Sequence, residues 1–369
     1  MRLSILYRGP LASCNYACWY CPFAKKTATP DERAADREAL ECFVAWVAGR
    51  QERFHLRPWW FTISHKPGRS TKPPIPRPHP PLCRGRGGKV ASVAPSRELG
   101  GGLGRESGVD QLSIFFTPWG EALIWPRYQQ AIARLSHMPH VDRVVIQTNL
   151  SCPLDWVADC NPRSLALWAT YHPSEVARGD FLSKVDELDR RGIRFSVGMV
   201  GMREHIAEIE AMRAALPSHL YLWVNAYKHG EHYYTPEHLQ RLAAVDPLFP
   251  INNQRHPSLG RSCRCGHTVI AVDGAGTIRR CHFIREPLGN LYEPDFERVL
   301  ERRPCTNETC GCYIGYVHME VLGLYEVFGA GVLERIPACY LTQRRKERKE
   351  NRARHFFNRR SRLTRMWNS

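Results

Sequence analysis

The sequence predicts an α/β fold in which parallel strands alternate with helices, and two observations lead to this prediction. Six short apolar runs of the strand type are each followed along the chain by a stretch with helix-like character. The chain has 369 residues, of which 43% are hydrophobic, so it can bury a large core. Such an alternation favours either a doubly wound sheet or a partial barrel, with the helices outside the sheet.

The expected elements follow one another in order. The strands are the runs 3–8, 111–116, 142–148, 165–171, 193–200 and 219–226. The helices are the stretches 31–49, 126–138, 154–159, 177–191, 203–215 and 236–245. Pro30-Asp31-Glu32 and Thr235-Pro236-Glu237 are helix-start signals, and Arg190-Arg191-Gly192 is a helix stop before the fifth strand. In both architectures ligands bind at the C-terminal ends of the strands, so functional residues are expected there.

Two basic segments stand apart from this alternation. Residues 51–109 form an insertion with 9 Pro and 9 Gly, a composition that predicts disorder. The insertion carries 11 Lys and Arg against 3 Asp and Glu, and the tail 339–369 carries 11 against 2. These two segments account for the net charge of +16, so the remainder is near neutral. The charge therefore does not indicate nucleic acid as the main partner.

The sequence also predicts the cellular setting. No run of about 18 apolar residues is present, so no membrane-spanning helix is expected. The apolar stretch in the N-terminal MRLSILYRGP is too short for a signal peptide and lacks a small-residue cleavage site. We therefore expect a cytoplasmic protein. In a reducing cytosol its 14 cysteines would not form a disulfide framework, and nine of them fall into two dense groups that indicate metal binding.

The first group is Cys14, Cys18 and Cys21, in the loop after the first strand. Three closely spaced thiolates can hold three irons of a cubane cluster and leave the fourth iron without a protein ligand. A zinc knuckle that takes a fourth ligand from elsewhere is the alternative. Zinc motifs favour paired C-x2-C spacings, which this x3/x2 triplet does not match.

The segment CNYACWYC at 14–21 resembles the cluster loop of the radical S-adenosylmethionine (radical SAM) superfamily, whose pattern is C-x3-C-x-aromatic-C, with Tyr20 as the aromatic residue. The resemblance covers residues 1–50 and 110–246 and implies a core that is a partial (β/α)6 barrel of the TIM type. It also implies that Cys14, Cys18 and Cys21 bind a catalytic [4Fe-4S] cluster. The amino and carboxylate groups of SAM would chelate its unique iron. An electron from the cluster would cleave SAM to methionine and a 5′-deoxyadenosyl radical, which abstracts hydrogen from the substrate.

The same resemblance implies further SAM-binding residues. Gly120 and Glu121, in the segment PWGE after the second strand, are similar to the glycine-glycine-glutamate turn that contacts the SAM amino group. Asn149 ends the third strand, where it could reach SAM or substrate, and Ser174 with His172 follows the fourth strand, near the expected ribose contact. Met199 and Gly201 resemble the end of the superfamily's adenine-side motif on the fifth strand.

The second cysteine group lies in a C-terminal α+β extension at 247–338. The runs 268–272 and 277–283 flank Asp273-Gly274-Ala275-Gly276, a hairpin signal. The C-x10-G-x4-C spacing from Cys265 to Cys281 resembles the opening of SPASM and twitch extensions, which carry auxiliary iron–sulfur clusters. It implies one such cluster, held by Cys265, Cys281, Cys310 and either Cys305 or Cys312, with Cys263 as a competitor. A structural zinc site is the alternative. Residues 316–336 are expected to form one helix that closes the extension.

These observations predict a radical SAM enzyme with an unidentified substrate. Peptide or protein maturation and small-molecule oxidation both stay open, so the substrate could be a precursor peptide or a pathway small molecule. A reductant such as flavodoxin or ferredoxin is the expected partner. The alternative from another class is a zinc-stabilised module that binds nucleic acid or protein through its basic tail.

Overall fold

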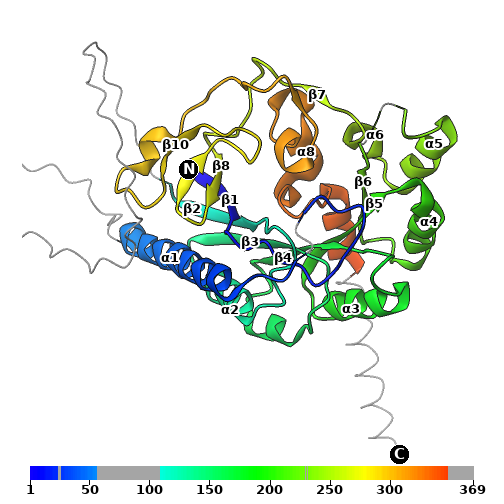
Figure 1. Ribbon diagram of the computed structural model, residues 1–369, viewed down its shortest axis with the longest axis horizontal. Helices are drawn as coiled ribbons and strands as arrows, with labels where there is room; N and C mark the ends of the chain where they lie inside the picture. Colours follow the sequence, from blue (N-terminus) through cyan, green and yellow to red (C-terminus); the bar gives the residue numbers. More distant parts are fainter. Residues whose placement is uncertain (24–25, 56–108, 229, 231, 348–369) are drawn as a thin grey trace, which may run out of the picture.

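The computed structural model describes residues 1–23, 26–55, 109–228, 230 and 232–347 (Figure 1). The helix expected at 31–49 is longer, because α1 (Pro30–His55) continues into the first residues assigned to the insertion. The rest of the predicted insertion, up to residue 108, and the tail beyond residue 347 lie outside the described residues. No helix in the described ranges is long and apolar enough to span a bilayer.

One mostly parallel sheet of nine strands organises the fold, in the order β10-β9-β8-β1-β2-β3-β4-β5-β6. Its strands are β1 (Arg2–Arg8), β2 (Gln111–Phe116), β3 (Val141–Thr148), β4 (Leu165–Thr170), β5 (Arg194–Gly201), β6 (Leu222–Ala226), β8 (Val269–Asp273), β9 (Thr277–Arg279) and β10 (Pro287–Asn290). The six predicted strands are confirmed and pair in parallel in chain order. β6 and β10 are the two edges of this sheet, and among the described residues they do not pair with each other.

The helices that follow these strands lie around the outside of the sheet (Figure 1). They are α2 (Pro126–Ser136), α3 (Arg178–Arg190), α4 (Ile206–Ala215), α5 (Pro236–Val245) and the short α6 (Phe249–Asn252), besides α1. The stretch expected at 154–159 forms only a 3-10 turn, Asp155–Asp159. The predicted start of α1 is a capping box, since Thr29 and Glu32 each accept the backbone N–H of the other through their side chains.

The two faces of the sheet are buried in different ways because successive strand residues point to opposite faces. One set, including Ile5, Ile114, Ile146 and Leu167, packs in the core shared with the helices. The alternate set, including Phe115 and Trp168, packs against the C-terminal segment 313–333. Burial on both faces explains why the parallel strands read as continuous apolar runs.

The prediction of one helix over 316–336 is wrong. The segment consists of α7 (Tyr313–Tyr316), a 3-10 turn at Glu320–Leu322, α8 (Leu324–Phe328) and a second 3-10 turn at Gly329–Gly331. Gly323 and Gly329 have φ values of +59° and +52°, which an α-helix cannot accommodate. The apolar residues of this segment serve to cover the sheet rather than one helix face.

The predicted hairpin at 273–276 is confirmed, and it joins the main sheet. β8 pairs in parallel with β1, with Ser4 opposite Val269, and β9 returns antiparallel to β8. A separate two-stranded ladder joins β7 (His256–Pro257) to β11 (Thr309–Cys310). The extension is therefore built onto the first strand of the sheet, beside the loop that carries the first cysteine group.

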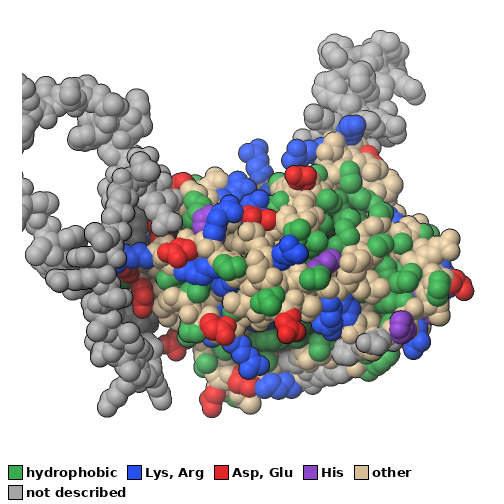
Figure 2. All heavy atoms as spheres, turned by 90° about the horizontal axis from the view of Figure 1, so that it is seen from above, with side chains coloured by type: hydrophobic (Ala, Val, Ile, Leu, Met, Phe, Trp, Pro, Cys, Tyr) green, Lys and Arg blue, Asp and Glu red, His purple; other side chains and the backbone are tan. Residues whose placement is uncertain are grey.

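Basic and acidic side chains are interspersed on the face of the molecule in Figure 2. This distribution is consistent with the near-neutral charge expected of the chain outside its two basic segments.

Candidate functional site

The loop between β1 and α1 presents the three cysteines of the first group. Cys18 is buried, and Cys14 and Cys21 are partly buried. Two backbone N–H groups point at sulfur: the nitrogen of Tyr16 lies 3.5 Å from Cys14 Sγ, and that of Phe23 lies 3.4 Å from Cys21 Sγ. Because donors of this kind favour the thiolate form, the loop suits thiolate ligands.

The protonation state of these thiols couples to metal binding. Burial, with a smaller contribution from Glu175, raises the pKa of Cys18 to about 12, and burial also raises the pKa of Cys14. A thiolate ligand must lose its proton, so metal binding here would release protons. Within the described ranges no three His, Cys, Asp or Glu side chains converge on the position of a single ion. The cysteines of a cubane need not converge in this way, because each binds a different iron.

Tyr20 ties the cysteine loop to the end of β4. Its hydroxyl lies 3.0 Å from Nδ1 of His172, and the two rings are stacked with their centroids 6.0 Å apart. Burial lowers the pKa of His172 to about 4 and raises that of Tyr20. The pair is therefore a neutral phenol bonded to a neutral imidazole, a contact that holds the loop without a net charge.

Glu121 follows β2 and is bound to the end of β3. Its carboxylate accepts from the N–H of Leu123 at 3.0 Å, from the Thr148 hydroxyl at 3.1 Å and from the N–H of Asn149. Burial raises the pKa of Glu121 to about 7, although these three donors oppose the shift. Glu121 is thus a deeply buried acid at the C-terminal ends of two neighbouring strands.

This pKa predicts a pH-dependent stability. The pKa of Glu121 in the unfolded chain lies near its ordinary value of 4.5, below the folded value. The folded state therefore binds this proton more tightly than the unfolded chain does. The stabilisation that the bound proton gives is lost as the pH rises through about 7. We expect the free energy of unfolding of the metal-free wild type to fall between pH 5 and pH 8. The fall should be about 1–3 kcal/mol larger than in the Glu121→Gln variant, as measured by urea denaturation. Parallel pH profiles for the two proteins would contradict this assignment.

Gly120 adopts a conformation that only glycine tolerates well. Its φ is +127°, and a Cβ atom placed on it would lie 2.1 Å from the carbonyl oxygen of Ser13. The same carbonyl accepts the N–H of Glu121 at 3.0 Å, so the turn after β2 rests directly against the cysteine loop. This close approach requires the absence of a side chain at position 120.

Replacing Gly120 with alanine is therefore expected to push the cysteine loop and the Glu121 turn apart. We expect the unfolding free energy to fall by about 1–3 kcal/mol from overpacking, and the capacity to bind iron to fall with it. Denaturant unfolding and iron analysis after reconstitution measure the two effects. Gly179→Ala is the matched control, since a Cβ there meets nothing within 4 Å. A Gly120→Ala protein as stable and as iron-loaded as this control would contradict the packing argument.

A cavity of about 470 Å³ lies where these elements meet, on the side of the sheet at which the parallel strands end. It is lined by all three motif cysteines. Four of the predicted cofactor residues also line it: Tyr20, Gly120, Glu121 and Asn149. The structure thus brings together residues from the β1, β2 and β3 ends, although Cys21 and Glu121 are 100 positions apart in the sequence.

The other three predicted cofactor residues are not among the residues that line this cavity. Met199 is buried in the core shared with the helices. The hydroxyl of Ser174 donates to Glu175, 3.0 Å away, and the carbonyl of Gly201 accepts from the Tyr234 hydroxyl at 2.6 Å. On β5 it is Val200, between Met199 and Gly201, that lines the cavity.

Several residues that line the cavity were missed by the sequence analysis. They include the cations Arg8, Lys228 and Arg255 and the aromatic residues Trp168 and Trp223. Arg8 is the last residue of β1, and Lys228 follows the end of β6 by two positions. The rule that ligands bind at the C-terminal ends of parallel strands could have found both.

Five cysteines of the second group lie together. Cys265 and Cys281 belong to the apolar cluster between the sheet and the C-terminal segment, and Cys263, Cys305 and Cys310 pack against it. The thiol of Cys265 hydrogen-bonds with those of both Cys263 and Cys281, which raises its own pKa and lowers that of Cys281 to about 7. Burial raises the pKa of Cys310, and the nearby thiols of Cys281, Cys312, Cys263 and Cys305 add to this shift, so Cys310 lies close to them. Five cysteines gathered in one apolar environment, with thiols that hydrogen-bond to one another, are a candidate metal-binding site.

Cys312 is placed differently from these five. It lines the 470 Å³ cavity and is not part of the apolar cluster that the other five contact. The charged groups with the largest effect on its thiol are the cations Lys228, Arg335 and Arg8. Of the predicted auxiliary ligands, Cys312 is therefore the one that faces the candidate active site.

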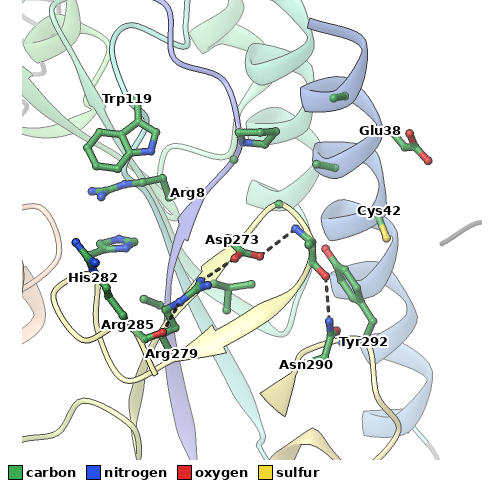
Figure 3. Close-up of a pocket in the computed structure, with 18 of the residues that line it drawn as sticks. Arg8, Glu38, Cys42, Trp119, Asp273, Arg279, His282, Arg285, Asn290 and Tyr292 are labelled. Atoms are coloured by element: carbon green, nitrogen blue, oxygen red, sulfur yellow. Dashed lines mark hydrogen bonds and ion pairs between the residues drawn. The ribbon is translucent and has the colours of Figure 1, made fainter. Parts of the chain in front are cut away.

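A second cavity, of about 860 Å³, lies between α1, the end of β1 and the β8–β10 region (Figure 3). It shares Arg8 with the first cavity, and the Arg8 guanidinium carbon lies 4.1 Å from the ring centre of Trp119, which lines the second cavity. An ion pair of 2.7 Å between Asp273 and Arg279 crosses its wall. None of the three motif cysteines lines it. The smaller cavity, which they do line, is therefore the candidate active site.

No family model matches the sequence, and comparison with curated proteins gives no match. Among solved structures, the chain is similar to anSMEcpe with bound AdoMet and a Cp18Cys peptide, with 12% identity over 81% of this chain and 82% of that chain and a TM-score of 0.43. It is also similar to anSMEcpe with bound AdoMet and a Kp18Cys peptide, with 11% identity over 82% of this chain and 81% of that chain and a TM-score of 0.46. A third similar structure is BtrN in complex with AdoMet and 2-DOIA, with 13% identity over 81% of this chain and 87% of that chain and a TM-score of 0.32.

Proposed function

We propose that this chain is a radical SAM enzyme, which generates a 5′-deoxyadenosyl radical from SAM and uses it to abstract hydrogen from a substrate that is still to be identified. One observation carries the proposal. Cys14, Cys18 and Cys21, with the spacing of the radical SAM motif, line the same cavity as Gly120 and Glu121, the pair similar to the superfamily's SAM-binding turn. In this proposal the mostly parallel sheet is the superfamily's partial barrel.

The residues at the site fit a three-cysteine [4Fe-4S] cluster. Their sulfurs lie in one short loop, and those of Cys14 and Cys21 receive backbone N–H donors. The loop is held in place from two sides, by the Gly120 turn and by the Tyr20–His172 pair. When bound there, the cluster would supply an iron that the amino and carboxylate groups of SAM can chelate, and the electron that cleaves SAM.

The chain's own residues would position SAM around that cluster. Glu121, fixed by donors from three residues, would accept from the SAM amino group at the end of β2. Asn149, whose Nδ2 donates to Asn15 Oδ1 at 3.2 Å, would present its amide from the adjacent strand. Such fixed partners keep the reacting bond near its productive geometry.

The second part of the proposal is an auxiliary iron–sulfur cluster in the extension at 247–338. The ligands we propose are Cys265, Cys281, Cys310 and one of Cys263 or Cys305, because these five thiols share one apolar environment. Cys312 is left facing the active-site cavity. A reductant such as flavodoxin or ferredoxin, and a cytoplasmic setting that keeps the thiols reduced, belong to the same proposal.

The proposal is tested by incubating the anaerobically reconstituted protein with SAM and dithionite. Release of 5′-deoxyadenosine and methionine is the expected result. A colourless protein that holds zinc and releases neither product would overturn the proposal and favour the zinc-stabilised binding module instead.

A further inference from the structure

Three cations from distant parts of the chain line the candidate active-site cavity. Arg8 ends β1, Lys228 follows β6, and Arg255 directly precedes β7. All three lie on the wall that also carries Cys312, since Arg8 and Lys228 act on its thiol and the Arg255 side chain approaches Gly311. The motif cysteines and Glu121 line the same cavity.

None of these three cations forms an ion pair with a carboxylate among the described residues. Arg8 donates through Nε to the Thr117 carbonyl at 2.7 Å, and Lys228 donates through Nζ to the carbonyls of Gln254 and Gly311. Glu121, the one carboxylate among the described residues that line this cavity, already accepts from three donors. Carbonyl oxygens orient the cations but do not balance their charge.

A fourth cation adds to the positive potential from behind the wall. The Arg335 side chain is fully buried, and its guanidinium carbon lies 4.6 Å from the ring centres of Trp223 and Tyr313, both of which line the cavity. Its Nε and Nη1 have no hydrogen-bond partner in the described part of the chain. Asp246, a buried acid on which Arg335 acts, already accepts hydrogen bonds from Tyr221, Val224 and Leu248.

Several cations around one cavity, with aromatic walls and little compensating charge, form a site that attracts an anion. We propose that the Cys312 side of the cavity binds an oxyanion of the substrate, a carboxylate or a phosphate, through Arg8, Lys228 and Arg255. Calling this ligand the substrate rests on the proposed function, whereas anion binding itself does not. The oxyanion would anchor one end of the substrate, and the apolar body of the substrate would lie along Trp168 and Trp223 toward the motif cysteines.

The test is calorimetric titration of inorganic phosphate, and separately of succinate, into reconstituted protein with saturating SAM in a low-chloride buffer. We expect at least one probe to bind with a dissociation constant in the millimolar range or below. Its dissociation constant should rise about tenfold or more in Lys228→Gln and in Arg255→Gln, since each loses a hydrogen bond to a charged group. Phosphate binding alone identifies a phosphate site, and succinate binding alone identifies a carboxylate site.

Two further variants separate loss of charge from loss of structure. Lys228→Arg keeps the charge and should retain most of the affinity, and Arg261→Gln removes an exposed arginine outside the cavity and should change nothing. The proposal is overturned if neither probe binds the wild type, or if the Lys228→Gln and Arg255→Gln proteins bind as the wild type does. It is also overturned if these variants lose affinity for SAM instead, because the cations would then serve the SAM carboxylate. Probe binding by a protein that releases no 5′-deoxyadenosine would support the anion site and count against the enzyme assignment alone.

Discussion

Replacing any one of Cys14, Cys18 and Cys21 with alanine is expected to abolish the reductive cleavage of SAM. Each thiolate would hold one iron of the cluster, so a variant with two thiolates loses both the cluster and the single open iron on which SAM chelation depends. The measurement is 5′-deoxyadenosine released with dithionite, and we expect a fall of at least about a hundredfold, on the scale of removing an essential metal-site group.

The matched control for these variants is Cys339→Ala, which removes an exposed free cysteine far along the chain from the motif. It should release 5′-deoxyadenosine at the wild-type rate. Normal release from any of the three motif variants would rule out the assignment of that cysteine as a ligand.

Replacing Cys281 with alanine is expected to empty the auxiliary site and leave the first cluster in place. Cys281 lies beside Cys265 in the apolar environment shared by the five thiols, so its loss would remove a central ligand of the proposed cluster. We expect the variant to lose about four irons of a total near eight, as for one cubane of two. SAM cleavage without substrate should persist, because Cys281 does not line the cavity that holds the motif cysteines.

Cys312→Ala provides the comparison within the same cysteine group. Its side chain lines the cavity rather than the apolar cluster, so this variant should keep the full iron content. A Cys281→Ala protein with undiminished iron, or wild-type protein with zinc at this site, would refute the auxiliary cluster. Loss of iron from Cys312→Ala would instead return Cys312 to the set of ligands.

Much of the fold could be predicted because local signals and burial agree. The six parallel strands are buried on both faces and therefore appear as apolar runs, and α5 begins at the proline that follows a capping threonine, as predicted. The prediction of one helix at 316–336 was wrong because an apolar segment that covers a sheet resembles a buried helix in sequence. The backbone leaves helical geometry at Gly323 and Gly329, and these two glycines were the sequence signal against a single helix.

The candidate site likewise combines residues that the sequence could identify with residues that it could not. The spacing of Cys14, Cys18 and Cys21 is a local pattern, so the sequence was enough to single them out. Met199 was predicted to bind the cofactor, but its neighbour Val200 is the residue that lines the cavity. Neighbouring residues on a strand face opposite sides of the sheet, so an error of one position selects the wrong face. The meeting of Lys228 and Arg255 with Arg8 depends on the order of strands in the sheet, which no local pattern encodes.

The central claim is that Cys14, Cys18 and Cys21 hold an iron–sulfur cluster with one iron open to SAM. It is tested most directly by the electron paramagnetic resonance spectrum of the dithionite-reduced wild-type protein, recorded with and without SAM. We expect an iron–sulfur signal that changes when SAM is added, since the amino and carboxylate groups of SAM would bind the open iron. A protein with no iron–sulfur signal, or with a signal that SAM leaves unchanged, would contradict the claim.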